Sequence, residues 1–344
     1  MSTLDPHAIP DLTAPPPPAT EDDKHEIHAL GYWESVWRVF KRDKVAIVGG
    51  ITILLLFLVS FAGAPIAQHF LGHDGNTPFL GGTTADNGAP IGPWAHVSQL
   101  PGNQGPKAFF ILGADSLVGR DEFLRLLYGG QTSLEIAVFA TIFATILGLL
   151  MGAAAGYFGG VTDTLISRLT ELVMAFPVLL FIIGLAEVAG TQLRGITLGF
   201  LPQGVFLLTT VFVIFGWFYP ARIARAQILS LREKEFVEAA RMTGASDWRI
   251  IRSHLLPHLV APMIVIATLS VGGFVLAEAG LSFLGIGITD PTSSWGQLLE
   301  LSLPYYRLNV FLLLWPGLMV LITTLSFNLL GDGLRDAFDP RTAN

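Results

Sequence analysis

The chain has 344 residues, of which 14% are charged and 51% are apolar, and its formal net charge is −7. Soluble domains carry about 25% charged residues, and here long stretches hold almost none, which indicates a membrane protein. The absence of cysteine excludes disulfides, thiolate metal sites and cysteine nucleophiles, and most of the 20 Lys and Arg flank apolar runs instead of forming a nucleic-acid-binding face.

Residues 1–28 contain a run of four prolines, 15–18, and an acidic run, 21–23, with few apolar side chains. Such a segment cannot bury enough apolar surface to fold. It also lacks the basic start and apolar centre of a signal peptide. We therefore expect a disordered cytosolic tail.

Residues 29–68 are expected to hold an interfacial helix followed by the first membrane span. Around Trp33 and Trp37, aromatic and aliphatic side chains alternate with Arg38, Lys41 and Arg42. This pattern is typical of a helix that lies in the lipid headgroup region. A plain continuation of the first span is the alternative.

A membrane crossing needs about 20 predominantly apolar residues. Six stretches meet this requirement, at about 45–64, 136–156, 172–189, 204–219, 259–277 and 310–330. They are apolar on every face, whereas a buried helix of a soluble protein is striped at helical spacing. The sequence therefore predicts an all-α, polytopic membrane protein with six transmembrane helices.

The orientation in the membrane follows from the basic residues, because cytosolic segments carry an excess of Lys and Arg. With a cytosolic N-terminus, only five of the 20 basic residues fall in outer segments: Lys107, Arg120, Arg125, Arg194 and Arg307. We predict a multi-pass protein of the cell (inner or plasma) membrane with both termini in the cytosol.

Residues 69–112 form a predicted extracytoplasmic insertion rich in Gly, Pro and Asn. Its composition is compatible with a small irregular subdomain and with a loop. His69 and His73 are four residues apart, but Gly72 and Gly75 argue against a rigid helix there. We interpret these histidines as solvated loop residues, and we predict no metal site and no cofactor.

The segment at about 230–257, which we call the elbow, is polar and lies between the fourth and fifth predicted spans. Gly244 is free to adopt the left-handed conformation that ends a helix. Ser246 is a good N-cap, and the acid that follows it suits the start of a second helix. Pro257 is expected to end that helix and to begin the fifth span. The elbow is therefore predicted to be two short cytosolic helices.

The first elbow helix carries features that suit contact with another protein. Ala239 and Ala240 are small enough for a close approach, and Phe236 and Val237 offer apolar anchors. A solvated loop helix is the alternative, in which these two apolar side chains have no partner.

The elbow resembles the cytosolic loop of permease subunits of ATP-binding-cassette importers, in the branch that takes up dipeptides, oligopeptides and, in some members, nickel. That loop carries Glu-Ala-Ala, three residues, Gly, nine residues, Ile, one residue and Leu-Pro. The matching residues are Glu238, Ala239, Ala240, Gly244, Leu256 and Pro257, whereas His254 replaces Ile.

Three further segments resemble the same branch. Asp115, Gly119, Arg120 and Asp121 match an outer signature of Gly-Thr-Asp, two residues and Gly-Arg-Asp, with one extra residue and with Ala in place of Thr. Residues 278–296 match the region around the end of the fifth span, and residues 327–336 match the C-terminal part. The resemblance covers about residues 30–68 and 110–341.

The resemblance implies a type I importer permease fold, with residues 113–341 forming a core of five spans and the elbow. It also implies a heterodimer with a sister permease, two cytosolic ATP-binding subunits, an extracytoplasmic solute-binding protein and a lipid bilayer. The ATPase-coupling residues that the resemblance implies are Glu238, Ala239, Ala240, Gly244, Leu256 and Pro257, and we predict that the apolar anchors Phe236 and Val237 take part with them.

The chain contains no Gly-Lys-Ser or Gly-Lys-Thr, so we predict no phosphate-binding loop and no enzyme activity of its own, with ATP hydrolysis left to partner subunits. The predicted function is that of a permease that imports peptides by alternating access. The alternatives are import of nickel or another small solute, and an ion-coupled secondary transporter.

Glu278 is the candidate residue for the substrate path, near the outer end of the fifth span. In one interpretation it lines the outer vestibule and attracts the ammonium group of a peptide. In the other it anchors the bent fifth span by hydrogen bonds around Gly280 and Gly285.

Overall fold

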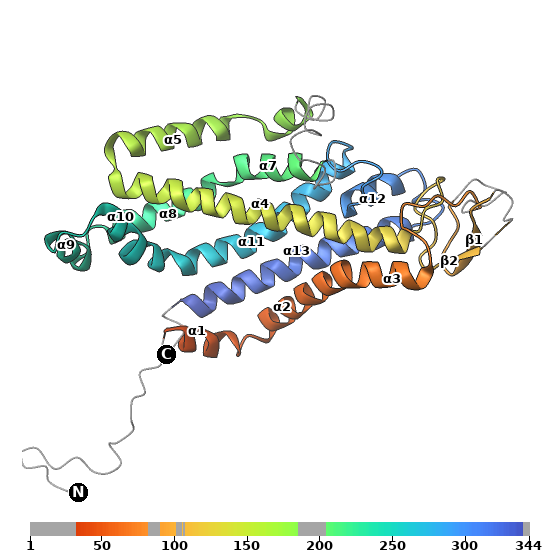
Figure 1. The fold of residues 1–344 in the computed structure, drawn as a ribbon, viewed down its shortest axis with the longest axis horizontal. Helices are drawn as coiled ribbons and strands as arrows, with labels where there is room; N and C mark the ends of the chain where they lie inside the picture. Colours follow the sequence, from red (N-terminus) through yellow and green to blue (C-terminus); the bar gives the residue numbers. More distant parts are fainter. Residues whose placement is uncertain (1–31, 82–89, 101–104, 106, 185–203, 340–344) are drawn as a thin grey trace, which may run out of the picture.

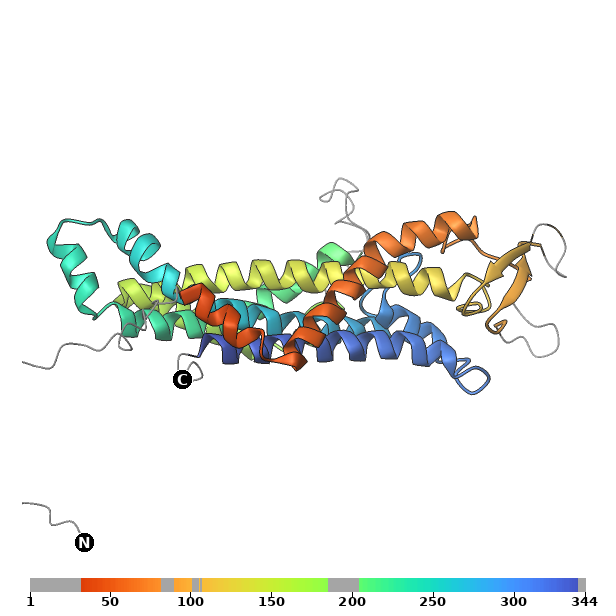
Figure 2. The same ribbon diagram turned by 90° about the horizontal axis from the view of Figure 1, so that it is seen from below.

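The fold is given by a computed structural model, which describes residues 32–81, 90–100, 105, 107–184 and 204–339 (Figure 1). The predicted tail, 1–28, and the end of the third predicted span, 185–189, lie outside the described residues. The described chain is a bundle of long helices (Figures 1 and 2). A two-stranded sheet lies at one end, which we call the sheet end, and the elbow lies at the opposite end, the elbow end.

The first helix, α1 (Tyr32–Phe40), is separated by a turn from α2 (Lys44–Phe57). Asp43 ends the turn, and its carboxylate accepts hydrogen bonds from the backbone N–H groups of Val45 (2.9 Å) and Ala46 (3.0 Å), which caps α2. A π-helical segment (Leu58–Gly63) then leads into α3 (Ala64–Leu71). The segment before the first span is thus a separate helix.

The longest helix is α4 (Glu122–Phe158), whose 37 residues extend about 55 Å at 1.5 Å per residue. It packs against α7 (Val205–Gly216) and α8 (Phe218–Leu231). A Cβ atom added to Gly152 would lie 2.3 Å from the backbone oxygen of Ala221. Glycine at this position therefore allows the backbones of α4 and α8 to touch.

Helix α5 (Gly160–Ala175) begins after a reversal at Gly159 and Gly160, both of which have positive φ. It is followed by the helix Val178–Gly184, and the two are bent by 74°. The third predicted span, 172–189, is therefore bent within its described part. Pro177 explains the bend, because it cannot donate the backbone hydrogen bond that would continue α5.

After α8 the chain forms α9 (Glu235–Met242), α10 (Asp247–Ile250) and a π-helical segment (Ile251–Leu255), and then α11 (Leu256–Phe283). The predicted end of the second elbow helix at Pro257 is wrong, because α10 runs into α11 without a break. The wider π-helical turn lies just before the proline and accommodates its ring and its missing donor. The chain ends with α12 (Trp295–Ser302) and α13 (Phe311–Phe338).

Among the described residues, five helical stretches are long and apolar enough to cross a membrane, and the bent pair formed by α5 and the helix after it makes a sixth if it is counted as one span. The five stretches are Lys44–Leu71, Glu122–Phe158, Val205–Leu231, Asp247–Phe283 and Phe311–Phe338. The prediction of an all-α membrane protein is therefore confirmed.

Part of the segment 69–112 forms a small subdomain at the sheet end. Strand β1 (Ala95–Ser98) pairs antiparallel with β2 (Lys107–Phe110), with Ala95 opposite Phe110. Phe79, Val97, Phe110 and Ala114 form its apolar core. The segment that leads into α4 is therefore part of a folded subdomain.

Candidate functional site

The elbow turns at Gly244, which has a φ of +81°. The Gly244 N–H donates to the Arg241 carbonyl (3.0 Å), and the Ala245 N–H donates to the Ala240 carbonyl (3.0 Å). This pair of bonds is a Schellman motif, in which the left-handed residue satisfies the last carbonyls of a helix. The predicted role of Gly244 in ending α9 agrees with this geometry. Ser246 takes the N-cap position of α10, but its side chain makes no capping hydrogen bond.

The end of α4 holds both arms of the elbow through one residue, Tyr157. Its hydroxyl donates to Asp247 on α10 (2.6 Å), and its ring lies 5.6 Å from the guanidinium of Arg241 on α9. Arg232 donates to the backbone oxygen of Gly156 (3.0 Å) at the same end of α4. The elbow is thereby fixed to the longest helix of the bundle.

Val237 does not offer an anchor to another protein. Its side chain is 0% exposed and packs inside the bundle in a cluster with Ile228, Ile250 and Leu255. Adjacent residues of a helix point about 100° apart, so Phe236 can be exposed while Val237 packs against the bundle. The prediction that Val237 is an outward anchor is wrong, and its role is to hold α9 against α8 and the α10–α11 region.

Phe236 is exposed, and its ring lies 5.6 Å from that of His258 on α11. Glu238, Ala239 and Gly244 are also exposed, whereas Ala240 is half-buried. Leu256 is half-buried against the same cluster as Val237, and Pro257 is exposed. The predicted coupling residues therefore divide into an exposed group and a group that packs into the bundle.

Two large apolar residues of the elbow were missed by the sequence reasoning. Met242 is 79% exposed and Trp248 is 64% exposed, and they lie on either side of the turn at Gly244. The sequence feature that could have identified them is their position in a polar segment outside any predicted span. An isolated apolar residue there has no lipid to contact. A cleft of about 460 Å³ beside Met242 is also lined by Arg232, Glu233, Glu238 and Arg241.

The outer signature residues meet at the sheet end in what we call the ion cluster, formed by Asp115, Arg120, Arg125 and Asp290. Asp115 pairs with Arg120 (3.0 Å) and Arg125 (2.9 Å), and Asp290 lies 3.1 Å and 3.2 Å from the same two guanidinium groups. The first three are buried, and Asp290 is half exposed. The cluster joins the start of α4 to the loop after α11. Arg125 and Asp290 were not among the predicted site residues.

Gly119 and Asp121 complete the signature. Gly119 has a φ of +72° and allows the tight turn before α4. Asp121 caps α4 by accepting from the backbone N–H groups of Phe123 (2.8 Å) and Leu124 (3.2 Å). The one-residue insertion in this signature is therefore compatible with a well-formed helix start.

His73 is not a solvated loop residue, contrary to the prediction. Its side chain is 5% exposed, and its Nε2 lies 2.8 Å from the carboxylate of Asp121. Burial alone lowers the pKa of His73, but the hydrogen bond and the charge of Asp121 outweigh it and raise the pKa above its ordinary value. Among the described residues no group of three metal-ligating side chains comes together.

Glu278 is 0% exposed, so in this structure it does not line a vestibule. Its two carboxylate oxygens accept from Ser133 on α4 (2.7 Å) and Ser282 on α11 (2.7 Å). Ser282 in turn accepts from the Ile288 N–H (2.9 Å), beyond the end of α11. The geometry favours the anchoring interpretation, because Glu278 ties α11 to α4.

The comparisons with known proteins agree on one family. Residues 137–344 match the family described as "Binding-protein-dependent transport system inner membrane component", and residues 31–78 match "N-terminal TM domain of oligopeptide transport permease C". The dipeptide transport system permease protein DppC of Alkalihalophilus pseudofirmus is 34% identical and covers 97% of this chain and 98% of its own. The oligopeptide transport system permease protein OppC of Haemophilus influenzae is 33% identical and covers 93% and 92%.

A third relative, the glutathione transport system permease protein GsiD of Pectobacterium atrosepticum, is 32% identical and covers 90% of this chain and 91% of its own. Among solved structures, an inward-facing MetNI methionine ABC transporter aligns with 62% of this chain and 95% of its own, at 18% identity and a TM-score of 0.48. The sequence matches confirm the resemblance that the four motifs indicated. Because one family model spans more than half of the chain, the protein belongs to the binding-protein-dependent transport system inner membrane components, which are permease subunits of ABC importers.

Proposed function

We propose that this chain forms half of the translocation pathway of an ATP-driven peptide importer and that its elbow transmits the motion of cytosolic ATPases. The curated relatives named above serve dipeptide, oligopeptide and glutathione transport. In the proposed complex the chain pairs with a sister permease, two ATP-binding subunits and an extracytoplasmic solute-binding protein. It is not itself a catalyst, and both of its termini lie in the cytosol with the elbow.

The observation that carries the coupling role is the division of the elbow into two faces. The inner face, around Val237, packs on α8 and the α10–α11 region, while Met242 and Trp248 remain exposed. Exposed aromatic and Met side chains are frequent anchors at protein interfaces. A partner that binds the outer face of the elbow would therefore move α8 and the α10–α11 region, which pack on the inner face.

The experiment uses the assembled complex in lipid nanodiscs and compares Trp248→Ser and Met242→Ser with the parent chain. Both variants are expected to lose copurifying ATPase and peptide-stimulated ATP hydrolysis, by about tenfold or more for an interface anchor. Trp94→Ser is the matched control, since Trp94 is 72% exposed at the opposite end of the bundle. Unchanged ATPase binding and stimulation in both elbow variants would remove the coupling role.

The same preparation tests the cargo and the energy source. Peptide uptake that requires ATP and all partners supports the proposal. Uptake of Ni²⁺ but not of peptide would show that the transported solute is nickel. Uptake by the purified chain alone would favour an ion-coupled secondary transporter.

A further inference from the structure

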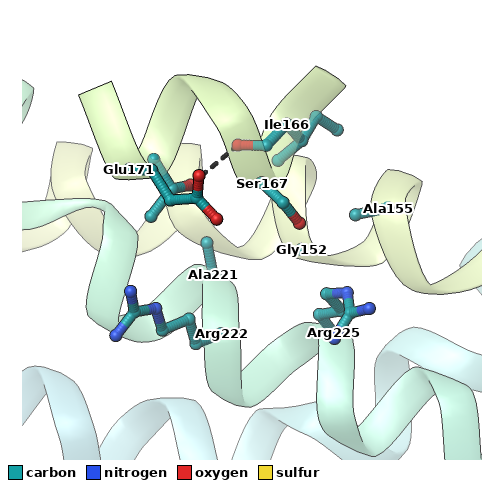
Figure 3. Close-up of a pocket in the computed structure, with 9 residues that line it drawn as sticks. Gly152, Ala155, Ile166, Ser167, Glu171, Ala221, Arg222 and Arg225 are labelled. Atoms are coloured by element: carbon teal, nitrogen blue, oxygen red, sulfur yellow. Dashed lines mark hydrogen bonds between the residues drawn. The ribbon is translucent and has the colours of Figure 1, made fainter. Parts of the chain in front are cut away.

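A cleft of about 360 Å³ lies between α4, α5 and α8, in the half of the bundle that carries the elbow (Figure 3). Its floor is made of small residues, Gly152, Ala155 and Ala221, which place the helix backbones close to its centre. The volume lies at the lower end of the range of small-molecule sites, about 300–1,000 Å³. The cleft therefore suits a small ligand.

Helix α5 forms one wall of the cleft and is attached to the opposite wall, α8, by a bidentate ion pair. Arg225 donates to the two carboxylate oxygens of Asp163, at 2.5 Å and 2.7 Å. Because Arg225 is paired with Asp163, its charge is not available to a ligand. The pair also sets the distance between the two walls of the cleft. The remaining charged groups of the lining are Glu171 on α5 and Arg222 on α8.

Glu171 lies on the α5 wall of the cleft and Arg222 on the α8 wall (Figure 3). The guanidinium of Arg222 contacts the sulfur of Met174 (2.9 Å), which is a weak acceptor. Glu171 accepts from Arg168 (2.7 Å), but both side chains are well exposed and such pairs contribute little. Both charges are thus available to a ligand in the cleft.

A cation and an anion on opposite walls match a ligand that carries a carboxylate at one end and an ammonium group at the other. A guanidinium binds a carboxylate through two parallel hydrogen bonds, and a carboxylate accepts from an ammonium group. We propose that Arg222 and Glu171 bind the C-terminal carboxylate and the N-terminal ammonium group of a short peptide as it passes through the permease. This inference rests on the proposed function, since it assigns the peptide a site in this chain.

The test measures ATP-driven uptake of dialanine and of its C-terminally amidated and N-acetylated forms by the assembled complex. Arg222→Gln is expected to slow uptake of the free peptide about tenfold, the effect of losing one charge-assisted hydrogen-bonded contact, and to leave the amidated form at its parental rate. Glu171→Gln is expected to do the same with the acetylated form. Each ratio compares variant and parent with one peptide, so the selectivity of the binding protein cancels.

Arg42→Gln is the matched control, because Arg42 is an exposed cation beside α1. Equal slowing of free and blocked peptides by Arg222→Gln, or unchanged uptake in both cleft variants, would overturn the site. A parent complex that imports no peptide would overturn the proposed function instead. Zwitterionic phosphatidylethanolamine has the same pair of charges, so variant effects that vanish in bilayers without it would assign the cleft to a lipid and refute peptide binding.

Discussion

Buried charged side chains connect distant segments at the sheet end of the bundle, whereas a buried apolar cluster connects helices at the elbow end. At the sheet end, the ion cluster joins the start of α4 to the loop after α11 through buried guanidinium and carboxylate groups. At the elbow end, an apolar cluster around Val237 joins α8, α9, α10 and α11.

The difference has a physical consequence. Charge pairs need a fixed geometry and tolerate little displacement, because a buried charge that loses its partner is strongly destabilising. Apolar packing is non-directional and leaves the outer face of the elbow for a partner. The charged contacts of the sheet end therefore favour one arrangement, whereas the elbow end keeps Met242 and Trp248 exposed on its outer face.

The largest expected effect comes from breaking the ion cluster. Arg125→Met leaves Asp115 buried with one partner fewer, and we expect a loss of about 3–5 kcal/mol of stability. The midpoint of thermal unfolding in nanodiscs measures it, with Arg307→Met as an exposed control expected to change stability by less than about 0.5 kcal/mol. A midpoint equal to that of the control would show that the sheet end does not depend on its charges.

A smaller effect is expected from Tyr157→Phe at the elbow. The variant loses the hydrogen bond to Asp247 but keeps the ring that faces Arg241, so we expect a cost of at most about 1.5–3 kcal/mol. Amide hydrogen exchange should increase in α9 and α10 and stay unchanged in β1 and β2. Phe158→Leu, at the exposed neighbouring position, is the control. An equal increase of exchange in α9–α10 and in β1–β2 would contradict the idea that the two ends of the bundle are stabilised independently.

Gly244→Ala is expected to cost about 1–2 kcal/mol, because alanine is strained at a φ of +81°. Gly280→Ala is the matched control, since a Cβ atom would meet nothing within 4 Å at either position and Gly280 lies in a helix. The control should be neutral or slightly stabilising. If both variants have the same exchange rates in the elbow, the left-handed turn is not what holds the two arms.

The smallest expected effect is the pH dependence of the sheet end. The folded-state pKa of His73 is raised, so its ion pair with Asp121 contributes fully below the unfolded pKa of about 6.5 and is lost as pH rises through the folded pKa. Hydrogen exchange of β1 and β2, corrected for the intrinsic pH effect, should therefore increase above pH 6.5. His73→Gln should remove the change, and a variant that keeps it would assign it to another group.

Local chemistry made the turn at Gly244 and the helix class predictable from the sequence. A left-handed residue after an Ala-rich helix has few alternatives to glycine, and uncharged apolar runs of about 20 residues have few alternatives to membrane spans. The failures have local causes as well. Val237 was assigned outward because an apolar side chain in a polar segment does not by itself show on which face of the helix it lies. The second elbow helix was ended at Pro257 because a proline lacks the donor that continues a helix.

The ion cluster was out of reach for a different reason. Asp290 meets Arg120 and Arg125 from 170 and 165 residues away in the chain. A sequence pattern within one segment cannot indicate a contact between residues so far apart in the chain. Glu278 is similar, because the hydroxyl of Ser133 that holds it lies 145 residues earlier.

Helix α4 begins directly after its cap residue Asp121, beside the ion cluster, and its second-last residue is Tyr157, which contacts both arms of the elbow. Its 37 residues contain no proline, whereas α11 and α13 carry Pro262 and Pro316 inside them. A helix without an internal proline lacks one common cause of a sharp kink. One continuous helix therefore connects the ion cluster to the elbow, so a change in the tilt of α4 displaces both ends of the bundle together.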